Sequence, residues 1–224
     1  MDRPFVPEVA TLPGFFKGQV LHAVFLVAML PATWALAAPW LRPETTPWFV
    51  AAVVEAVLHQ IVVWLGWRAQ LGFHVWTKVF GDRDLLAWCL TFFPLLLARP
   101  ALLLALAWVD QGSLALPREV ALPLGVFLLL PSVATLVSVR TAFGMVRAAG
   151  SDHFRTEDRD LPLVREGMFR FTPNAMYVFA FLGLWAVALL AGSQLALIAA
   201  LFQHAYIQVH WLATEQPDLE SLRS

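Results

Sequence analysis

The chain is poor in cysteine and in charge, and it has no excess of basic residues. Cys89 is its single cysteine, which excludes an intramolecular disulfide framework. Charged residues make up 14% of the 224 residues, whereas a soluble domain carries about a quarter. The formal net charge of −1 argues against nucleic-acid binding, because the protein side of such an interface is basic. These shortages disfavour both a nucleic-acid-binding protein and an ordinary soluble enzyme.

Hydrophobic residues make up 59% of the chain and gather in long runs. Because a helix needs about 20 apolar residues to cross a bilayer, we predict an all-α, polytopic membrane protein that forms a single domain over residues 1–224. The first four expected spans are residues 19–41, 47–67, 85–109 and 119–139. Residues 174–213 contain no Asp, Glu, Lys or Arg and are long enough for two spans. We predict a helical hairpin there, about 174–191 and 194–212, that turns at Gly192-Ser193.

The total is therefore six spans, of which the third is the least regular. Pro94 and the Arg99-Pro100 pair interrupt it, and proline breaks or kinks a helix. We expect a broken helix or two short helices at this place. Five spans are the alternative if the third does not cross.

Basic residues predict the orientation of the chain, because Lys and Arg concentrate in cytoplasmic loops. With six spans, one side receives twelve of the 15 basic residues, namely Arg3, Lys17, Arg68, Lys78, Arg83, Arg140, Arg147, Arg155, Arg159, Arg165, Arg170 and Arg223. The other side receives Arg42 and Arg118, and Arg99 lies within the third span. We therefore expect both termini and residues 140–173 to face the cytoplasm, in a bacterial inner membrane.

One densely charged segment precedes the hairpin. Residues 151–170 carry nine charged side chains, yet Leu161 to Val164 and Met168 to Phe171 are largely apolar insertions. A loop that extends freely into water would leave these apolar side chains exposed to solvent. We predict that residues 151–173 are ordered over the cytoplasmic end of the hairpin.

A spaced set of residues begins in this segment. Leu163-Val164, Gly167 and Phe169 are followed by Asn174 and Tyr177, then by the hairpin, and Glu215 comes directly after it. This order and spacing resemble the integral-membrane methyltransferases, which include the phosphatidylethanolamine N-methyltransferases and isoprenylcysteine carboxyl methyltransferase. The resemblance divides the chain into a four-span region, 1–139, and a methyltransferase-like region, 140–224.

The resemblance implies methyl transfer from S-adenosylmethionine to a membrane lipid, with the polar loop folded over the hairpin to bind the cofactor from the cytosol. It implies no metal. The cofactor-binding residues that it implies are Leu161, Leu163, Val164, Gly167, Phe169, Asn174, Tyr177 and Glu215. The chain departs from the family pattern at three places. Leu161 replaces a histidine, Pro173-Asn174-Ala175 replaces Arg-His-Pro, and Trp211 stands where carboxyl methyltransferases carry a substrate-binding arginine.

The nucleophile decides the substrate. A carboxylate is already ionised and needs an arginine to hold it, whereas an ethanolamine ammonium must first lose a proton to a general base. The candidate bases are His210, Glu55 and His59, together with Asp152 and His153. Glu55 and His59 lie at i, i+4 on one helix face. Because Trp211 carries no charge, we favour an amine lipid such as phosphatidylethanolamine over a prenylcysteine-like carboxylate.

Two other classes of function remain open at this point. The six histidines at 22, 59, 74, 153, 204 and 210 allow a haem-binding membrane protein, although no pair shares a motif. The proline breaks in the third span fit a small transporter loosely, but the sequence shows no internal repeat. Binding of S-adenosylmethionine without a Soret band would separate a methyltransferase from a haem protein.

Overall fold

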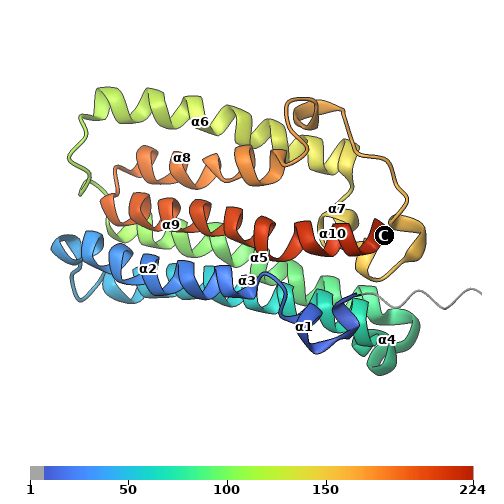
Figure 1. Ribbon diagram of the computed structural model, residues 1–224. Helices are drawn as coiled ribbons and strands as arrows, with labels where there is room; N and C mark the ends of the chain where they lie inside the picture. The colour runs from blue at the N-terminus through green and yellow to red at the C-terminus, as the bar shows by residue number, and fades with distance from the viewer. Residues whose placement is uncertain (1–7, 224) are drawn as a thin grey trace, which may run out of the picture.

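A computed structural model describes residues 8–223, which form helices and connecting loops without a strand (Figure 1). Six helices lie side by side as a bundle. They are α2 (Gln19–Ala37), α3 (Thr46–Phe73), α5 (Asp84–Val109), α6 (Arg118–Ser138), α8 (Leu182–Ala191) and α9 (Gln194–His210). Short helices α1 (Leu12–Phe15), α4 (Val75–Phe80), α7 (Met145–Ala148) and α10 (Gln216–Arg223) lie at one end. The all-α prediction is confirmed.

Within the described residues, five helical segments are long and apolar enough to cross a membrane. They are Leu12–Trp40, Thr46–Phe73, Val75–Val109, Arg118–Phe143 and Gln194–Leu222. The sixth predicted span corresponds to a shorter apolar helix, Met176–Ala191. The short segment is therefore the first arm of the hairpin and not the third span. It is short because Pro173 and Asn174 lie in a turn, so that regular helix begins late.

The expected break in the third span is wrong. Helix α5 runs without interruption through Pro94 and Pro100. Apolar spanning helices tolerate proline because neighbouring groups satisfy the backbone that it frees. Arg99 strengthens the helix packing here, since its Nη2 donates to the carbonyl of Ala56 on α3 at 3.2 Å.

Helices α9 and α3 form the centre of the bundle. In the most apolar windows of the spans that contain them, 61% and 50% of residues are buried, compared with 17–22% in those of α2, α5 and α6. These outer helices expose large apolar side chains such as Val27, Leu90 and Phe127. Exposed apolar faces of this extent are typical of contact with lipid. The chain is therefore an integral membrane protein.

Asp110 fixes the end of the bundle that carries the hairpin turn. This buried carboxylate accepts hydrogen bonds from the hydroxyls of Ser113 and Ser193 at 2.6 and 2.7 Å, and from the Leu195 amide at 3.0 Å. Ser193 also caps α9 by accepting from an amide of its first turn. Gly192 supplies the left-handed conformation at the end of α8, with φ of 65°. The turn predicted at Gly192-Ser193 is present.

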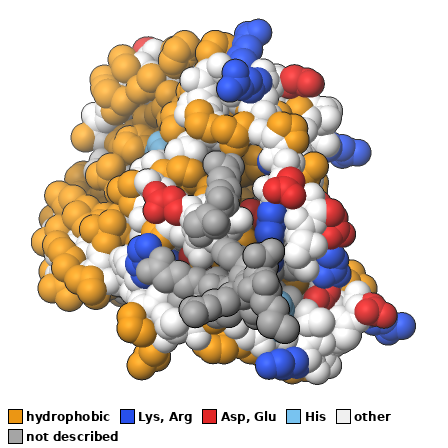
Figure 2. All heavy atoms as spheres, turned by 45° about the vertical axis from the view of Figure 1, so that its right-hand side comes forward, with side chains coloured by type: hydrophobic (Ala, Val, Ile, Leu, Met, Phe, Trp, Pro, Cys, Tyr) orange, Lys and Arg blue, Asp and Glu red, His pale blue; other side chains and the backbone are white. Residues whose placement is uncertain are grey.

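The opposite end, which we call the polar end, contains α1, α4, α7, α10 and residues 149–173 (Figure 1). The described chain begins and ends there. Charged side chains gather at this end, and the neighbouring flank of the bundle is hydrophobic (Figure 2). At the far end, Arg42 pairs with Asp110 at 3.2 Å and Arg118 begins α6. Arg3 lies outside the described residues.

Arg68 joins three segments at the polar end. Its side chain lies on α3 and is fully buried. Nη1 donates to the carbonyls of Phe15 and Lys17, both at 2.7 Å, and Nε donates to Asp218 of α10 at 2.9 Å. Nη2 reaches the carbonyl of Ala213 at 3.3 Å. One guanidinium thus holds the N-terminal segment and the end of the hairpin against α3.

Candidate functional site

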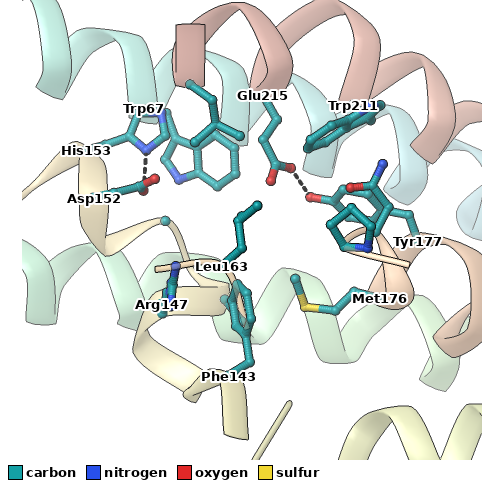
Figure 3. A pocket seen from close by; sticks show the side chains of 15 residues that line it. Trp67, Phe143, Arg147, Asp152, His153, Leu163, Met176, Tyr177, Trp211 and Glu215 are labelled. Carbon is teal, nitrogen blue, oxygen red and sulfur yellow. Dashed lines mark hydrogen bonds and ion pairs between the residues drawn. The ribbon is translucent and has the colours of Figure 1, made fainter. Parts of the chain in front are cut away.

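A polar cavity of about 100 Å³ opens at the polar end, between residues 143–174 and the hairpin (Figure 3). Its polar lining includes the carboxylates of Asp152 and Glu215 and the side chain of Asn174. Aromatic rings close it from four helical segments, namely those of Trp67, Phe143, Tyr177 and Trp211. Leu163 reaches into it from the loop (Figure 3).

Three π-helical turns occur within the described residues, and all three supply walls of this cavity. They are Val139–Phe143 after α6, Met176–Ala180 before α8 and Trp211–Glu215 after α9. A π turn inserts an extra residue into a helix and re-aims the side chains around it, and such turns are frequent at functional sites. Phe143, Met176, Tyr177, Trp211 and Glu215 all reach the cavity from these turns.

Glu215 faces Tyr177 across the cavity. The phenol hydroxyl of Tyr177 donates to Oε2 of Glu215, which joins the two arms of the hairpin (Figure 3). Gln208 supports the same junction by donating to the Tyr177 carbonyl at 3.1 Å. The hydrogen bond leaves the second oxygen of the Glu215 carboxylate available to a ligand in the cavity.

His153 clamps the loop to the bundle between two carboxylates. Its Nδ1 lies 2.9 Å from Asp152, its Nε2 lies 3.4 Å from Asp218, and its ring stacks on Trp67 with centroids 4.6 Å apart. Burial alone would lower the pKa of His153, but Asp152 and Asp218 outweigh it and raise the pKa to about 10. The imidazolium in turn holds the pKa of Asp152 below its usual value, against the effect of burial. His153 is therefore a fixed cation at neutral pH and not a general base.

The clamp predicts a pH dependence of stability. Because the pKa of His153 is about 10 in the folded protein and about 6.5 in an unfolded chain, its contribution is complete below pH 6.5 and is lost as the pH rises through 10. We expect the denaturation temperature in detergent to fall between pH 7 and pH 10. In His153→Asn this fall should be smaller. An identical fall in both proteins would contradict the assignment.

The rest of the charged segment is also anchored. Arg155 pairs with Asp84 at the start of α5 at 2.7 Å, and the Met168 amide donates to the Ser138 hydroxyl on α6 at 3.0 Å. Gly167 has φ of 55° and sits so close to Ser138 that a Cβ would lie 2.3 Å from its hydroxyl oxygen. Residues 151–173 therefore pack over the end of the hairpin, and the predicted ordering is confirmed.

A second, apolar cavity of about 460 Å³ lies deeper in the bundle. It shares Trp67, Ala148, Met176 and Tyr177 with the polar cavity, so the two cavities adjoin at these side chains. Further in, its lining is mostly apolar and includes Phe92, Phe93, Leu96, Leu136 and Phe181. A largely apolar volume therefore adjoins a polar site at the end of the bundle.

The structure distributes the predicted cofactor residues between two roles. Leu163, Asn174, Tyr177 and Glu215 line the polar cavity. Phe169 is buried and stacks on Phe143 at 4.9 Å, and Val164 packs against the same cluster. Gly167 allows the close approach to Ser138. The side chain of Leu161 is exposed, and its carbonyl accepts from Arg147 at 3.4 Å. These other four residues therefore support the loop and do not line the polar cavity.

The three predicted catalytic residues also separate. His210 and His59 line the apolar cavity, and Nδ1 of His210 has no hydrogen-bond partner in the described part of the chain. Glu55 is buried behind His59, with 3.8 Å between its Oε1 and the His59 Nδ1. His210 thus lies nearest to the junction of the cavities, where Trp67 is its neighbour at 5.7 Å between ring centroids.

Sequence reasoning missed Trp67, Phe143 and Arg147 in the cavity wall, and Arg68 and Asp218 behind it. Trp67 and Phe143 sit in or beside apolar runs, where an aromatic residue gives no sign of facing a polar space. Arg68 and Asp218 could have been singled out from the sequence, because each is a charged residue near the end of a predicted span. Their pairing across 150 positions does not show in the sequence.

The helical bundle, the π turns and the adjoining cavities define an integral membrane protein with a polar site at one end of a C-terminal hairpin. Residues 120–222 match the family model of the phospholipid methyltransferases. This match confirms the resemblance to the integral-membrane methyltransferases, and it includes the fourth span. Comparisons with curated proteins and with solved structures find no match.

Proposed function

We propose that the protein transfers a methyl group from S-adenosylmethionine to the amine head group of a membrane phospholipid. The observation that carries this proposal is the contact between the two cavities at Trp67, Ala148, Met176 and Tyr177. A water-soluble methyl donor enters the polar cavity from the polar end, and a lipid enters the apolar cavity from the bilayer. Their reactive groups meet where the aromatic walls exclude water.

The residues of the polar cavity fit a cofactor that carries charges of both signs, because Arg147 and His153 line it beside Asp152 and Glu215. S-adenosylmethionine, when bound, supplies a methyl group activated by a sulfonium charge. Glu215 and Asp152 offer carboxylates to its positively charged and hydroxyl groups, and Tyr177 and Trp211 offer aromatic faces, which favour a nearby cation. Asn174 adds both donors and acceptors. The charged segment over the cavity holds these groups in place through His153.

The amine must be neutral to attack, so a base has to remove its proton. His210 is placed for this step, because it lines the apolar cavity, is buried and has an unpartnered Nδ1 among the described residues. We assign it the general base. Trp211 favours an amine acceptor as well, since an uncharged aromatic side chain lines the polar cavity there and attracts an ammonium better than a carboxylate.

Carboxyl methylation of a prenylcysteine-like acceptor is the second candidate, because Arg99 and Arg140 line the apolar cavity and offer cations to an acid. The pH dependence of the reaction separates the two candidates. An ethanolamine ammonium, with a pKa near that of a lysine side chain, gains free amine as the pH rises, whereas a carboxylate is fully ionised throughout the same range.

The test is a labelled-methyl assay with purified protein in detergent and each acceptor class, from pH 6 to pH 9. We expect methylation of phosphatidylethanolamine, with an initial rate that rises with pH, and poor methylation of a prenylcysteine analogue. Cofactor affinity is measured over the same range as a control. Efficient prenylcysteine methylation without activity on ethanolamine lipids would favour the second candidate.

A further inference from the structure

Arg99 brings a buried guanidinium with one unpartnered donor to the wall of the apolar cavity. The residue is 3% exposed and lines the cavity from α5. Its Nε donates to Nδ1 of His59 and its Nη2 to the Ala56 carbonyl, both at 3.2 Å. Nη1 has no partner within residues 8–223. An ionised group that is buried with a free donor is costly unless a ligand satisfies it.

Glu55 is the counter-ion of this guanidinium but does not occupy its free donor. The nearest approach is 3.8 Å from the Arg99 Nε to the Glu55 Oε2, and neither carboxylate oxygen makes a hydrogen bond in the described structure. Glu55 also lies outside the cavity lining, whereas Arg99 lies in it. Glu55 therefore leaves the Nη1 donor of Arg99 without a partner, on a residue that lines the cavity.

The position of Arg99 relative to the polar cavity decides which part of an acceptor it meets. Its guanidinium carbon lies 5.5 Å from the ring centroid of Phe181, four residues after Tyr177. The stretch between them belongs to the π turn Met176–Ala180, so Phe181 lies about one turn from Tyr177. Tyr177 borders the polar cavity, so Arg99 lies about one turn deeper than the expected site of transfer.

We propose that Arg99 binds the phosphodiester of the acceptor lipid and selects acceptors that carry an anion set back from the methylated atom. This inference rests on the proposed function. An ethanolamine nitrogen at Tyr177 places its phosphate, two carbons away, on the deeper side beside Arg99, while the glycerol and acyl chains lie against the apolar lining of the same cavity. Arginine is well suited to phosphate because its donors form a planar fork. A carboxylate that is itself methylated would lie at the polar cavity, beyond Arg99.

The test measures binding without S-adenosylmethionine, by calorimetry on the full chain in uncharged detergent. The probes are dihexanoylphosphatidylmethanol, which has a phosphodiester and no amine, dihexanoylglycerol, which has neither, and dodecanoate. Wild type should bind the phosphodiester most tightly. Arg99→Gln should weaken this binding roughly tenfold to hundredfold and leave dihexanoylglycerol unchanged. Arg99→Lys should retain part of the preference.

Two variants guard against a merely structural effect. Glu55→Gln combined with Arg99→Gln keeps the local charge balance, and it should lose the preference while its denaturation temperature stays near that of wild type. Arg140→Gln removes the exposed arginine of the same cavity and should keep the preference. The inference is overturned if wild type binds the phosphodiester and dihexanoylglycerol equally. It is also overturned if dodecanoate binds best, or if Arg140→Gln and not Arg99→Gln removes the preference.

The outcomes separate this inference from the proposed function. A phosphodiester preference that depends on Arg99, in a protein that transfers no methyl group to any lipid, supports the anion site and contradicts methyl transfer. Methylation of phosphatidylethanolamine by a protein whose binding ignores the phosphodiester supports methyl transfer and contradicts the anion site.

Discussion

Arg68→Met is expected to lower the denaturation temperature in detergent by roughly 6–20 °C. Removing one partner of a buried ion pair costs about 3–5 kcal/mol, and each kcal/mol shifts the midpoint of a chain of this size by roughly 2–4 °C. The variant leaves Asp218 buried, with His153 at 3.4 Å. It also removes the donor shared by the carbonyls of Phe15 and Lys17. Thermal denaturation followed by circular dichroism measures the shift.

Arg118→Met is the matched control, since it makes the same substitution at an exposed site on α6. Its denaturation temperature should stay close to that of wild type. Adding Asp218→Asn to Arg68→Met should recover part of the loss, because the stranded carboxylate is then neutral. If Arg68→Met and Arg118→Met lose the same small amount, the buried pair does not hold the polar end together.

The fold was largely predictable because lipid-spanning helices follow from apolar length. The runs at 19–41, 47–67 and 119–139 became α2, α3 and α6 with small shifts at their ends. Length alone could not show that α5 continues through Pro94 and Pro100, since this depends on neighbouring helices. The shortness of α8 was also hidden, because it depends on where the turn after Pro173 ends.

The site was predictable only at the residues that belong to a short sequence motif. Tyr177 and Glu215 were both expected at the cofactor site, and the structure joins them by a hydrogen bond. The sequence analysis did not predict the π turns that carry them, Met176–Ala180 and Trp211–Glu215. Phe169 shows what sequence spacing does not predict. It was expected to bind the cofactor, but its side chain stacks on Phe143 and supports the loop. An aromatic residue at a given spacing does not reveal which side of a loop it faces.

Glu215→Gln is expected to weaken S-adenosylmethionine binding roughly tenfold to hundredfold. A hydrogen bond to a charged group contributes about 1.5–3 kcal/mol, and the substitution removes the charge while a side-chain oxygen remains to accept from Tyr177. The fold should persist, because the polar end is held by Arg68, Asp218 and His153. Calorimetry on the detergent-solubilised variant, with denaturation temperature as the check on folding, measures the effect.

Glu220→Gln is the matched control for this charge. Glu220 lies on α10, is exposed, and accepts from Gln216 at 3.2 Å, outside the cavity lining. It changes the net charge by the same amount, so a general electrostatic effect would appear in both variants. Tyr177→Phe adds a second comparison, since it keeps the carboxylate but frees it from the phenol. If Glu215 binds the cofactor through its charge, Tyr177→Phe should weaken binding less than Glu215→Gln does.

An unchanged dissociation constant in Glu215→Gln would mean that the cofactor contacts Asp152 and the aromatic walls without Glu215. The carboxylate would then serve only to join the two arms of the hairpin, and the cofactor would lie nearer the loop than the hairpin.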